Sequence, residues 1–127
     1  DKNKFKKEDE IFINFMFTLH ENNFINDEQV KNFLNNLNLN YPKANLIITE
    51  VFDFPSNILS NINDQSILPE FILFHKLSNQ RLFYYDQLKK IIKKSNYFIH
   101  DQINYSQIKK NGYNSPTYST FHLKPKL

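Results

Sequence analysis

The sequence lacks cysteine and tryptophan and contains a single glycine among 127 residues. Without cysteine, the chain can form no disulfide bond, no Cys-ligated zinc or iron–sulfur site and no thiol nucleophile. Glycine-rich loops that hold phosphate groups need several glycines, so Gly112 alone excludes nucleotide sites of the Rossmann and Walker types. No apolar run reaches the roughly 18 residues of a membrane-spanning helix. We therefore expect an intracellular protein without a transmembrane segment, with nuclear and organellar compartments both open.

The length and composition describe one domain. A chain of 127 residues with 40% hydrophobic residues can bury one apolar core but is too short for two. Gly112, Pro116 and Pro125 interrupt the C-terminal segment, which is typical of an extended or flexible chain. We expect a single globular domain over residues 1–110 and an extended C-terminal tail over residues 111–127.

Residues 11–21 fit two kinds of secondary structure. Phe12, Phe15 and Leu19 follow helical spacing, whereas every second residue from Ile11 to Leu19 is also apolar, as in a strand. The acidic residues 8–10 would stabilise the positive end of a helix that follows them. This charge pattern favours the helix.

The next segment has the clearest local signal. Asn26 is placed to cap a helix, Gln29 can bond back to the amide of residue 26, and Ile25 can pack on Val30. A helix over residues 27–38 follows from an apolar stripe made by Val30, Phe33, Leu34 and Leu37.

The remaining segments mix strand and helix signals. Residues 44–54 fit either a buried strand or a helix, and a short helix is expected within 56–68. Residues 71–77 and 81–85 are apolar runs separated by three polar residues, a pattern that predicts a β-hairpin. A helix is expected to begin at Asp86. The prediction is an α+β fold, a small helical domain with a β-hairpin.

The order of these elements resembles that of a winged-helix domain, in which the hairpin is the wing. Phe12 to Leu37 carry the resemblance for the first two helices, and Phe71 to Tyr85 carry it for the wing. Residues 39–70 are too long for a single recognition helix, so the resemblance implies an insertion there. Winged-helix domains bind DNA or serve as protein-docking modules. The resemblance therefore implies a binding function.

Charge is divided unevenly along the chain. Residues 1–75 contain six basic and eleven acidic residues, whereas residues 76–127 contain ten basic and two acidic residues. Ten of the 13 Phe lie in the first part and six of the seven Tyr in the second. Because Phe is a core residue and Tyr has a polar tip suited to interfaces, the first part reads as scaffold and the second as a contact surface.

Nine residues of the basic part are the candidate contact site for nucleic acid or another partner. Lysine and arginine could neutralise phosphates, and tyrosine could stack on unpaired bases. The candidates are Lys76, Arg81, Tyr84, Tyr85, Lys89, Lys90, Lys93, Lys94 and Tyr97. The lysines at 89–94 also fit the solvated side of an ordinary amphipathic helix. With one arginine in the chain, recognition of guanine in a duplex is disfavoured.

No catalytic or metal-binding motif is present in the sequence. His20, His75, His100 and His122 are scattered and lack the spacing that places two ligands on one helix face. We predict a non-catalytic binding subunit of a larger macromolecular assembly, without a cofactor. Its partners would be other protein subunits, with DNA or RNA contact through the basic second half. The alternatives are a stand-alone nucleic-acid-binding winged helix and a small enzyme whose site no motif marks.

Overall fold

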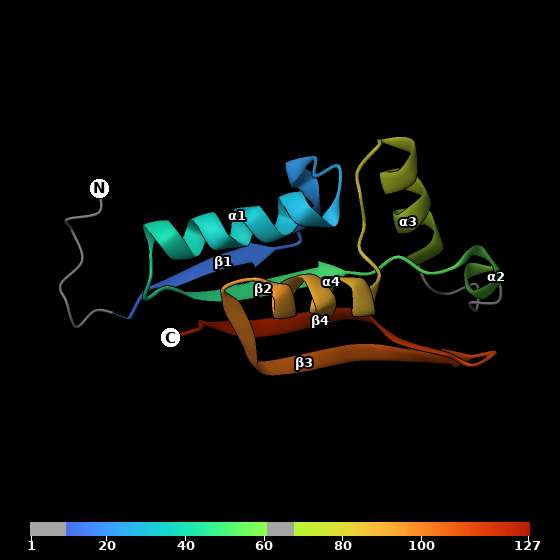
Figure 1. Ribbon diagram of the computed structural model, residues 1–127. Coiled ribbons are helices and arrows are strands. Elements are labelled where there is room, and N and C mark those ends of the chain that lie inside the picture. Colours follow the sequence, from blue (N-terminus) through green and yellow to red (C-terminus); the bar gives the residue numbers. More distant parts are fainter. Residues whose placement is uncertain (1–9, 61–67) are drawn as a thin grey trace.

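The computed structural model describes residues 10–60 and 68–127. In this part of the chain, two strands and the helices precede a C-terminal pair of long strands (Figure 1). The elements in chain order are β1 (Phe12–Met16), the 3-10 helix η1 (Leu19–Asn22), α1 (Asp27–Asn40), β2 (Asn45–Val51), α2 (Ser56–Leu59), α3 (Leu68–Leu77), α4 (Tyr85–Lys94), β3 (Tyr97–Lys110) and β4 (Tyr113–Pro125).

The strands form one mixed sheet in the order β1-β2-β4-β3. β1 and β2 are parallel and are joined by α1, the crossover helix that a parallel pair requires. β3 and β4 form an antiparallel hairpin, and β4 also pairs with β2 in the antiparallel direction. In the described part of the chain, β1 and β3 are therefore the two edge strands.

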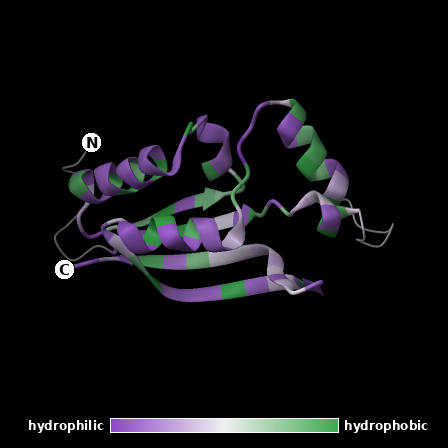
Figure 2. Ribbon diagram, turned by 45° about the vertical axis from the view of Figure 1, so that its right-hand side comes forward, coloured by the Kyte–Doolittle hydropathy of each residue, from purple (hydrophilic) through white to green (hydrophobic). Residues whose placement is uncertain are grey.

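The core lies between the sheet and the helices α1 and α4, which lie on the same face of the sheet (Figures 1 and 2). Ile48 and Phe121 from the sheet, Leu34 from α1 and Leu88 from α4 are fully buried. Helices and a four-stranded sheet thus share one core, which confirms the α+β class.

The prediction of a helix at residues 11–21 is wrong, because residues 12–16 form β1. Ile13 and Phe15 face the core and pack on it, and the strand pairs with β2 from Phe12↔Asn45 to Met16↔Thr49. The segment adopts the strand indicated by its alternating apolar residues, because β2 supplies hydrogen-bond partners along all of β1. The ambiguity at residues 44–54 is resolved in the same way, as the strand β2.

The capped helix is confirmed as α1. The Asn26 side chain accepts a hydrogen bond from the Gln29 amide at 2.9 Å. The Gln29 side chain returns a bond to the amide of Ile25 at 2.8 Å, one residue earlier than expected. Val30 and Leu34 are buried under the helix.

The prediction of a hairpin over residues 71–85 is wrong. Residues 71–77 belong to α3, where Leu68, Ile72 and His75 share one buried side at helical spacing. Residue 83 makes only an isolated bridge to Phe52. A short apolar run fits a strand or a helix equally well, and none of the strands in residues 10–60 and 68–127 pairs with this segment.

The short helix expected within 56–68 is α2, and residues 61–67 lie outside the described part.

The hairpin of this fold is β3–β4, and its second strand lies where a tail was expected. Asn111 and Gly112 form its two-residue turn, with φ of 50° and 77°. Both residues adopt left-handed conformations, which Asn-Gly favours in such turns. The segment 111–127 is extended, as expected, and residues 113–125 of it form β4 between β2 and β3.

Of the elements on which the winged-helix resemblance was based, only some have the expected conformation. The capped helix is present as α1, whereas the first helix is replaced by β1 and η1. The segment expected as the wing forms α3 and the loop that precedes α4. The resemblance carries no further argument below.

Candidate nucleic-acid and partner interface

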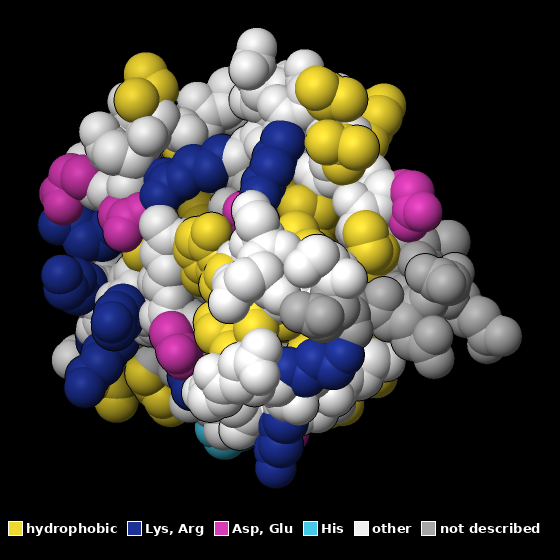
Figure 3. All heavy atoms as spheres, turned by 90° about the vertical axis from the view of Figure 1, so that its right-hand side faces the viewer, with side chains coloured by type: hydrophobic (Ala, Val, Ile, Leu, Met, Phe, Trp, Pro, Cys, Tyr) yellow, Lys and Arg dark blue, Asp and Glu magenta, His cyan; other side chains and the backbone are white. Residues whose placement is uncertain are grey.

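Five of the nine candidate residues, Tyr85 and four lysines, lie on one helix. In α4, Leu88, Ile91 and Ile92 face the core, which places the four lysines of the helix on its other sides. The helix begins where the Tyr84 amide bonds the Gln87 side chain at 3.2 Å. Figure 3 shows Lys and Arg side chains gathered along its left side, where α4 lies in that view. We call Lys89, Lys90, Lys93 and Lys94 the α4 lysines.

The α4 lysines are not neutralised by neighbouring carboxylates. Among the described residues, none of them belongs to an ion pair. The Lys89 ammonium lies 4.8 Å from the centre of the Tyr85 ring, a cation–π contact that leaves its charge uncompensated. These four charges therefore remain open to an anionic partner.

The other two cationic candidates are used inside the fold. Lys76 forms an ion pair with Asp53 at 3.2 Å, and Arg81 binds Asp27 at the start of α1. The Arg81 guanidinium also lies 5.5 Å from the centre of the Phe83 ring. Because both charges are balanced internally, Lys76 and Arg81 do not extend the surface of the α4 lysines.

The tyrosines are mostly unavailable for stacking on bases. Tyr97 is fully buried, and burial raises the pKa of its phenol. The Tyr85 ring packs near Phe52 and Phe121, with its hydroxyl accepting a hydrogen bond from Gln102 at 2.9 Å. Only Tyr84, 41% exposed, has a ring that could receive a base. The tyrosines were predicted to stack because the sequence does not show which of them the core would take.

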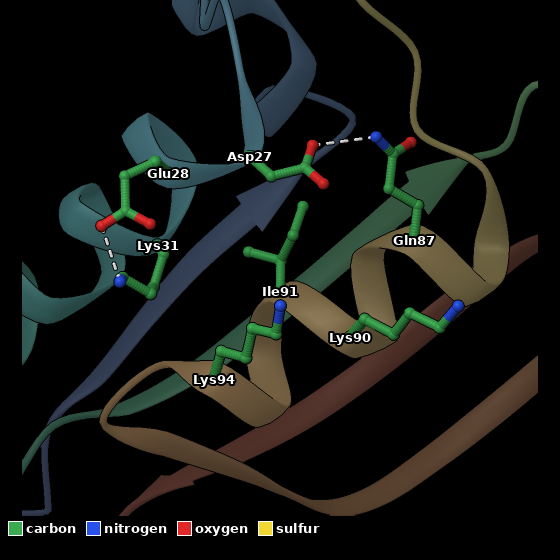
Figure 4. A pocket seen from close by; sticks show the side chains of 7 residues that line it. All are labelled: Asp27, Glu28, Lys31, Gln87, Lys90, Ile91 and Lys94. Carbon is green, nitrogen blue, oxygen red and sulfur yellow. Dashed lines mark hydrogen bonds and ion pairs between the residues drawn. The ribbon is translucent and has the colours of Figure 1, made fainter.

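One side of α4 faces a small pocket of mixed charge, about 300 Å³ in volume (Figure 4). Lys90 and Lys94 reach it from α4, and Asp27 and Glu28 reach it from α1. Lys31 pairs with Glu28 at 2.6 Å, and Gln87 donates a hydrogen bond to Asp27 at 2.9 Å. Because anionic groups line it, this pocket is poorly suited to an anion.

The other side of α4 faces a larger groove that ends on the edge strand β3, with a volume of about 610 Å³. Its lining combines apolar side chains with a rim of lysines and one aspartate. The residues are Asp86, Lys89, Lys90, Ile92, Lys93, Tyr97, Phe98, Ile99 and Lys126. We call this the α4–β3 groove. It brings together four of the nine candidates, namely Lys89, Lys90, Lys93 and Tyr97.

A second surface was missed by the sequence analysis. The face of the sheet opposite α1 and α4 carries Phe12, Met16, Phe98 and Ile103, which are between 42% and 58% exposed. We call it the outer sheet face. The alternation of residues 11–19 is the signal that could have found it, because a strand places every second side chain on the face away from the core.

Histidine keeps part of the outer sheet face uncharged. The His122 ring lies 5.9 Å from Phe12 and 5.0 Å from His100, measured between ring centres. Burial lowers the pKa of His122, and the nearby His100 and Lys124 lower it further. At neutral pH the imidazole is therefore uncharged, in keeping with the apolar side chains beside it.

A third exposed apolar group lies on α3. Leu73, Phe74 and Leu77 are between 56% and 75% exposed, although the helix buries its opposite side. Figure 3, which looks onto the end of the molecule that carries α3, shows a group of hydrophobic side chains at its upper right. Residues 71–77 thus contribute apolar side chains both to the core and to the exposed surface.

A fully buried carboxylate holds η1 against the sheet. The Glu50 carboxylate is fully buried, accepts the Leu19 amide at 2.7 Å and lies 2.6 Å from His20 Nδ1. His75 packs edge-on to the His20 ring at 4.9 Å and bonds the Phe71 carbonyl. These contacts satisfy a buried carboxylate and join η1, β2 and α3. Their evident role is structural.

Three further findings bear on the class of protein. No helix in residues 10–60 and 68–127 is long and apolar enough to cross a membrane. In the same residues, no three His, Asp or Glu side chains come close enough to hold a metal ion. No protein-family model matches the chain, and no curated protein matches its sequence.

Proposed function

We propose that this protein is a non-catalytic subunit of a larger macromolecular assembly and that it binds another protein chain through the outer sheet face. The observation that carries the proposal is that helices cover one face of the sheet while the other face exposes Phe12, Met16 and Ile103. Burying large apolar side chains stabilises a complex in proportion to the area removed from water. Phe12 and Met16 lie on one edge strand and Ile103 on the other, and large apolar side chains exposed on one face commonly mark an interface.

The uncharged His122 supports a protein partner on this face. The groups beside the imidazole are the Phe12 and His100 rings, the Asn45 side chain, which is 3.4 Å from Nε2, and Asp101, its partner on β3. Lysine contributes only Lys124 to this part of the sheet, and Glu10 bonds to Asn45 nearby at 3.2 Å. A surface of this kind is suited to an apolar protein patch and ill suited to a phosphate backbone.

A double substitution tests this proposal. Met16→Glu with Ile103→Glu places two charges on the outer sheet face, whereas Ile25→Glu with Leu39→Glu places two charges at similarly exposed apolar positions, 81% and 79% exposed, outside it. In affinity purification with quantitative mass spectrometry, we expect stoichiometric partner proteins to fall at least about tenfold with the first pair and to be retained with the second.

Two results would contradict the proposal, one from the affinity purification and one from the mass of each purified variant in solution. Equal recovery of partners with both double variants would contradict binding through this face. A dimer of the isolated chain that the Met16 and Ile103 substitutions dissociate would show that the face serves self-association instead.

The α4 lysines support nucleic-acid contact as a second candidate function. Four uncompensated charges on one helix could neutralise phosphates of a single strand, and Tyr84 offers one exposed ring at the start of that helix. If all four lysines bind phosphates, affinity should fall about 50-fold between 50 and 200 mM salt.

A titration with a labelled thymidine 20-mer measures this dependence. Substitution of the four α4 lysines by glutamate should abolish binding at low salt. Lys109→Glu with Lys110→Glu, at the other end of β3, should leave most of it. Binding that ignores the α4 substitutions would exclude this helix as the contact surface.

A further inference from the structure

We infer that the α4–β3 groove receives a short, extended, acidic segment of a partner protein, which pairs with the free edge of β3 as an additional strand. The inference rests on the proposed function, since it names the chemistry of one partner segment, but it concerns the edge of β3, which adjoins the outer sheet face at Phe98 and Ile103. Three features of the groove carry it: a free strand edge, an apolar lining and a rim of lysines.

The first feature is the free edge of β3. In the described sheet, β3 pairs only with β4, so the backbone N–H and C=O groups on its other side have no strand partner. A terminal strand of this kind is a template for a further strand. Its sequence contains no proline, which would interrupt such pairing. The bulge at Ile99/Asp101 increases the local twist and limits the added strand to a few residues.

The second feature is the lining of the groove. Ile92 of α4 lines the groove together with Tyr97, Phe98 and Ile99 of β3, so apolar side chains follow the start of the free edge. Phe98 is 42% exposed, and this exposed area would be covered by a neighbouring strand. Apolar side chains on the incoming segment would therefore be removed from water on binding.

The third feature is charge. Lys89, Lys90 and Lys93 of α4 and Lys126 lie along the groove, against a single acid, Asp86. The Lys126 ammonium is held in place by the Lys93 and Ser95 carbonyls, at 2.8 and 2.6 Å. An excess of fixed positive charge favours an acidic segment and disfavours a basic one.

The geometry of a strand specifies the pattern of that segment. Side chains of an added strand alternate between the two faces of the sheet. Those on the helix side would meet the α4 lysines, and those on the other side would lie beside Phe98 and Ile103. The expected segment therefore alternates acidic and apolar residues.

A nucleic acid would use less of this groove. Tyr97 is fully buried and offers no face for a base, and the free amide and carbonyl groups of β3 have no counterpart in a phosphate backbone. Nucleic acid nevertheless shares the attraction to lysine, so it enters the test as a competing outcome.

The probe is a fluorescein-labelled seven-residue peptide of alternating glutamate and valine, titrated with the whole chain and followed by fluorescence anisotropy. We expect Lys89→Glu with Lys93→Glu to weaken binding at least about tenfold. Lys109→Glu with Lys110→Glu changes the charge equally at the far end of β3 and should weaken it less than about twofold. Circular dichroism of each variant verifies that the fold is kept.

A second peptide separates strand pairing from simple charge attraction. N-methylation of alternate backbone amides, on the edge that would face β3, removes hydrogen-bond donors without changing charge, and should weaken binding at least about tenfold. Hydrogen exchange of the β3 amides should slow when the unmodified peptide is bound. Equal affinity for the methylated and unmodified peptides would overturn the inference.

The remaining outcomes are also decisive. If the thymidine 20-mer binds through Lys89 and Lys93 while the peptide does not bind, the groove is a nucleic-acid surface and the inference is wrong. If the peptide fails to bind but Met16→Glu with Ile103→Glu still removes the partner proteins, the inference fails and the proposed function stands. Peptide binding without such partners supports the groove and contradicts the outer sheet face.

Discussion

Replacing Glu50 with alanine is expected to lower the free energy of unfolding by about 3–5 kcal/mol, as measured by urea denaturation at pH 7. The carboxylate is fully buried, accepts the Leu19 amide and pairs with His20 at 2.6 Å. Its removal leaves a buried amide and a buried imidazole without their acceptor, and no water can replace it without entering the core. Glu50→Gln, which keeps an acceptor oxygen and the side-chain volume, should cost clearly less.

The matched control is Glu21→Ala, an exposed glutamate of the neighbouring η1, which should change stability by less than about 0.5 kcal/mol. A double-mutant cycle with His20→Ala measures the pair itself and should give a coupling of at least about 1 kcal/mol. Equal stability of Glu50→Ala and Glu21→Ala would show that the carboxylate does not hold η1 to β2.

Replacing Phe121 with alanine is expected to cost a similar amount, about 3–5 kcal/mol. Phe121 lies in β4, is fully buried and packs its ring near Phe52 and Tyr85, with both ring centres 6.3 Å away. The substitution leaves a cavity at the centre of the sheet. Because the stability of a domain is about 5–15 kcal/mol in total, the variant should lose a large fraction of it.

Phe98→Ala is the control for this prediction, because it removes the same ring from a half-exposed position on the adjacent strand β3. It should cost less than about 1 kcal/mol. If residues 111–127 were a flexible tail outside the domain, Phe121→Ala would also be nearly neutral. The difference between the two variants therefore measures how far β4 belongs to the core.

The elements that the sequence predicted are those whose signals are local. The cap at Asn26 and the apolar stripe of α1 involve residues within one or two helical turns, so their pattern is complete in the sequence. The same holds for α4, where Leu88, Ile91 and Ile92 separate the α4 lysines from the core. The turn at Asn111-Gly112 is also a local signal, and it was misread as flexibility because glycine and proline residues lie close together there.

The elements that the sequence did not predict depend on distant partners. β1 is a strand because β2 lies beside it, more than thirty positions later in the pairing Phe12↔Asn45. The run 71–77 is a helix whose buried side is Leu68, Ile72 and His75, and no described strand pairs with it, although its composition fits a strand. In the candidate site, the charge pattern of the sequence was enough to find the α4 lysines. The burial of Tyr97 and the ion pairs of Lys76 and Arg81 could not be predicted, because they depend on contacts between distant segments.

By itself, the sequence determined that this chain lacks cysteine, begins a capped helix at residue 27 and has a basic second half that carries the α4 lysines. Only the tertiary structure decided which of these residues are accessible. It buried Tyr97, paired Arg81 with Asp27, made β3 an edge strand and left the outer sheet face uncovered. The reason is that composition and periodicity report what a segment can bury, whereas exposure depends on which segments lie against it.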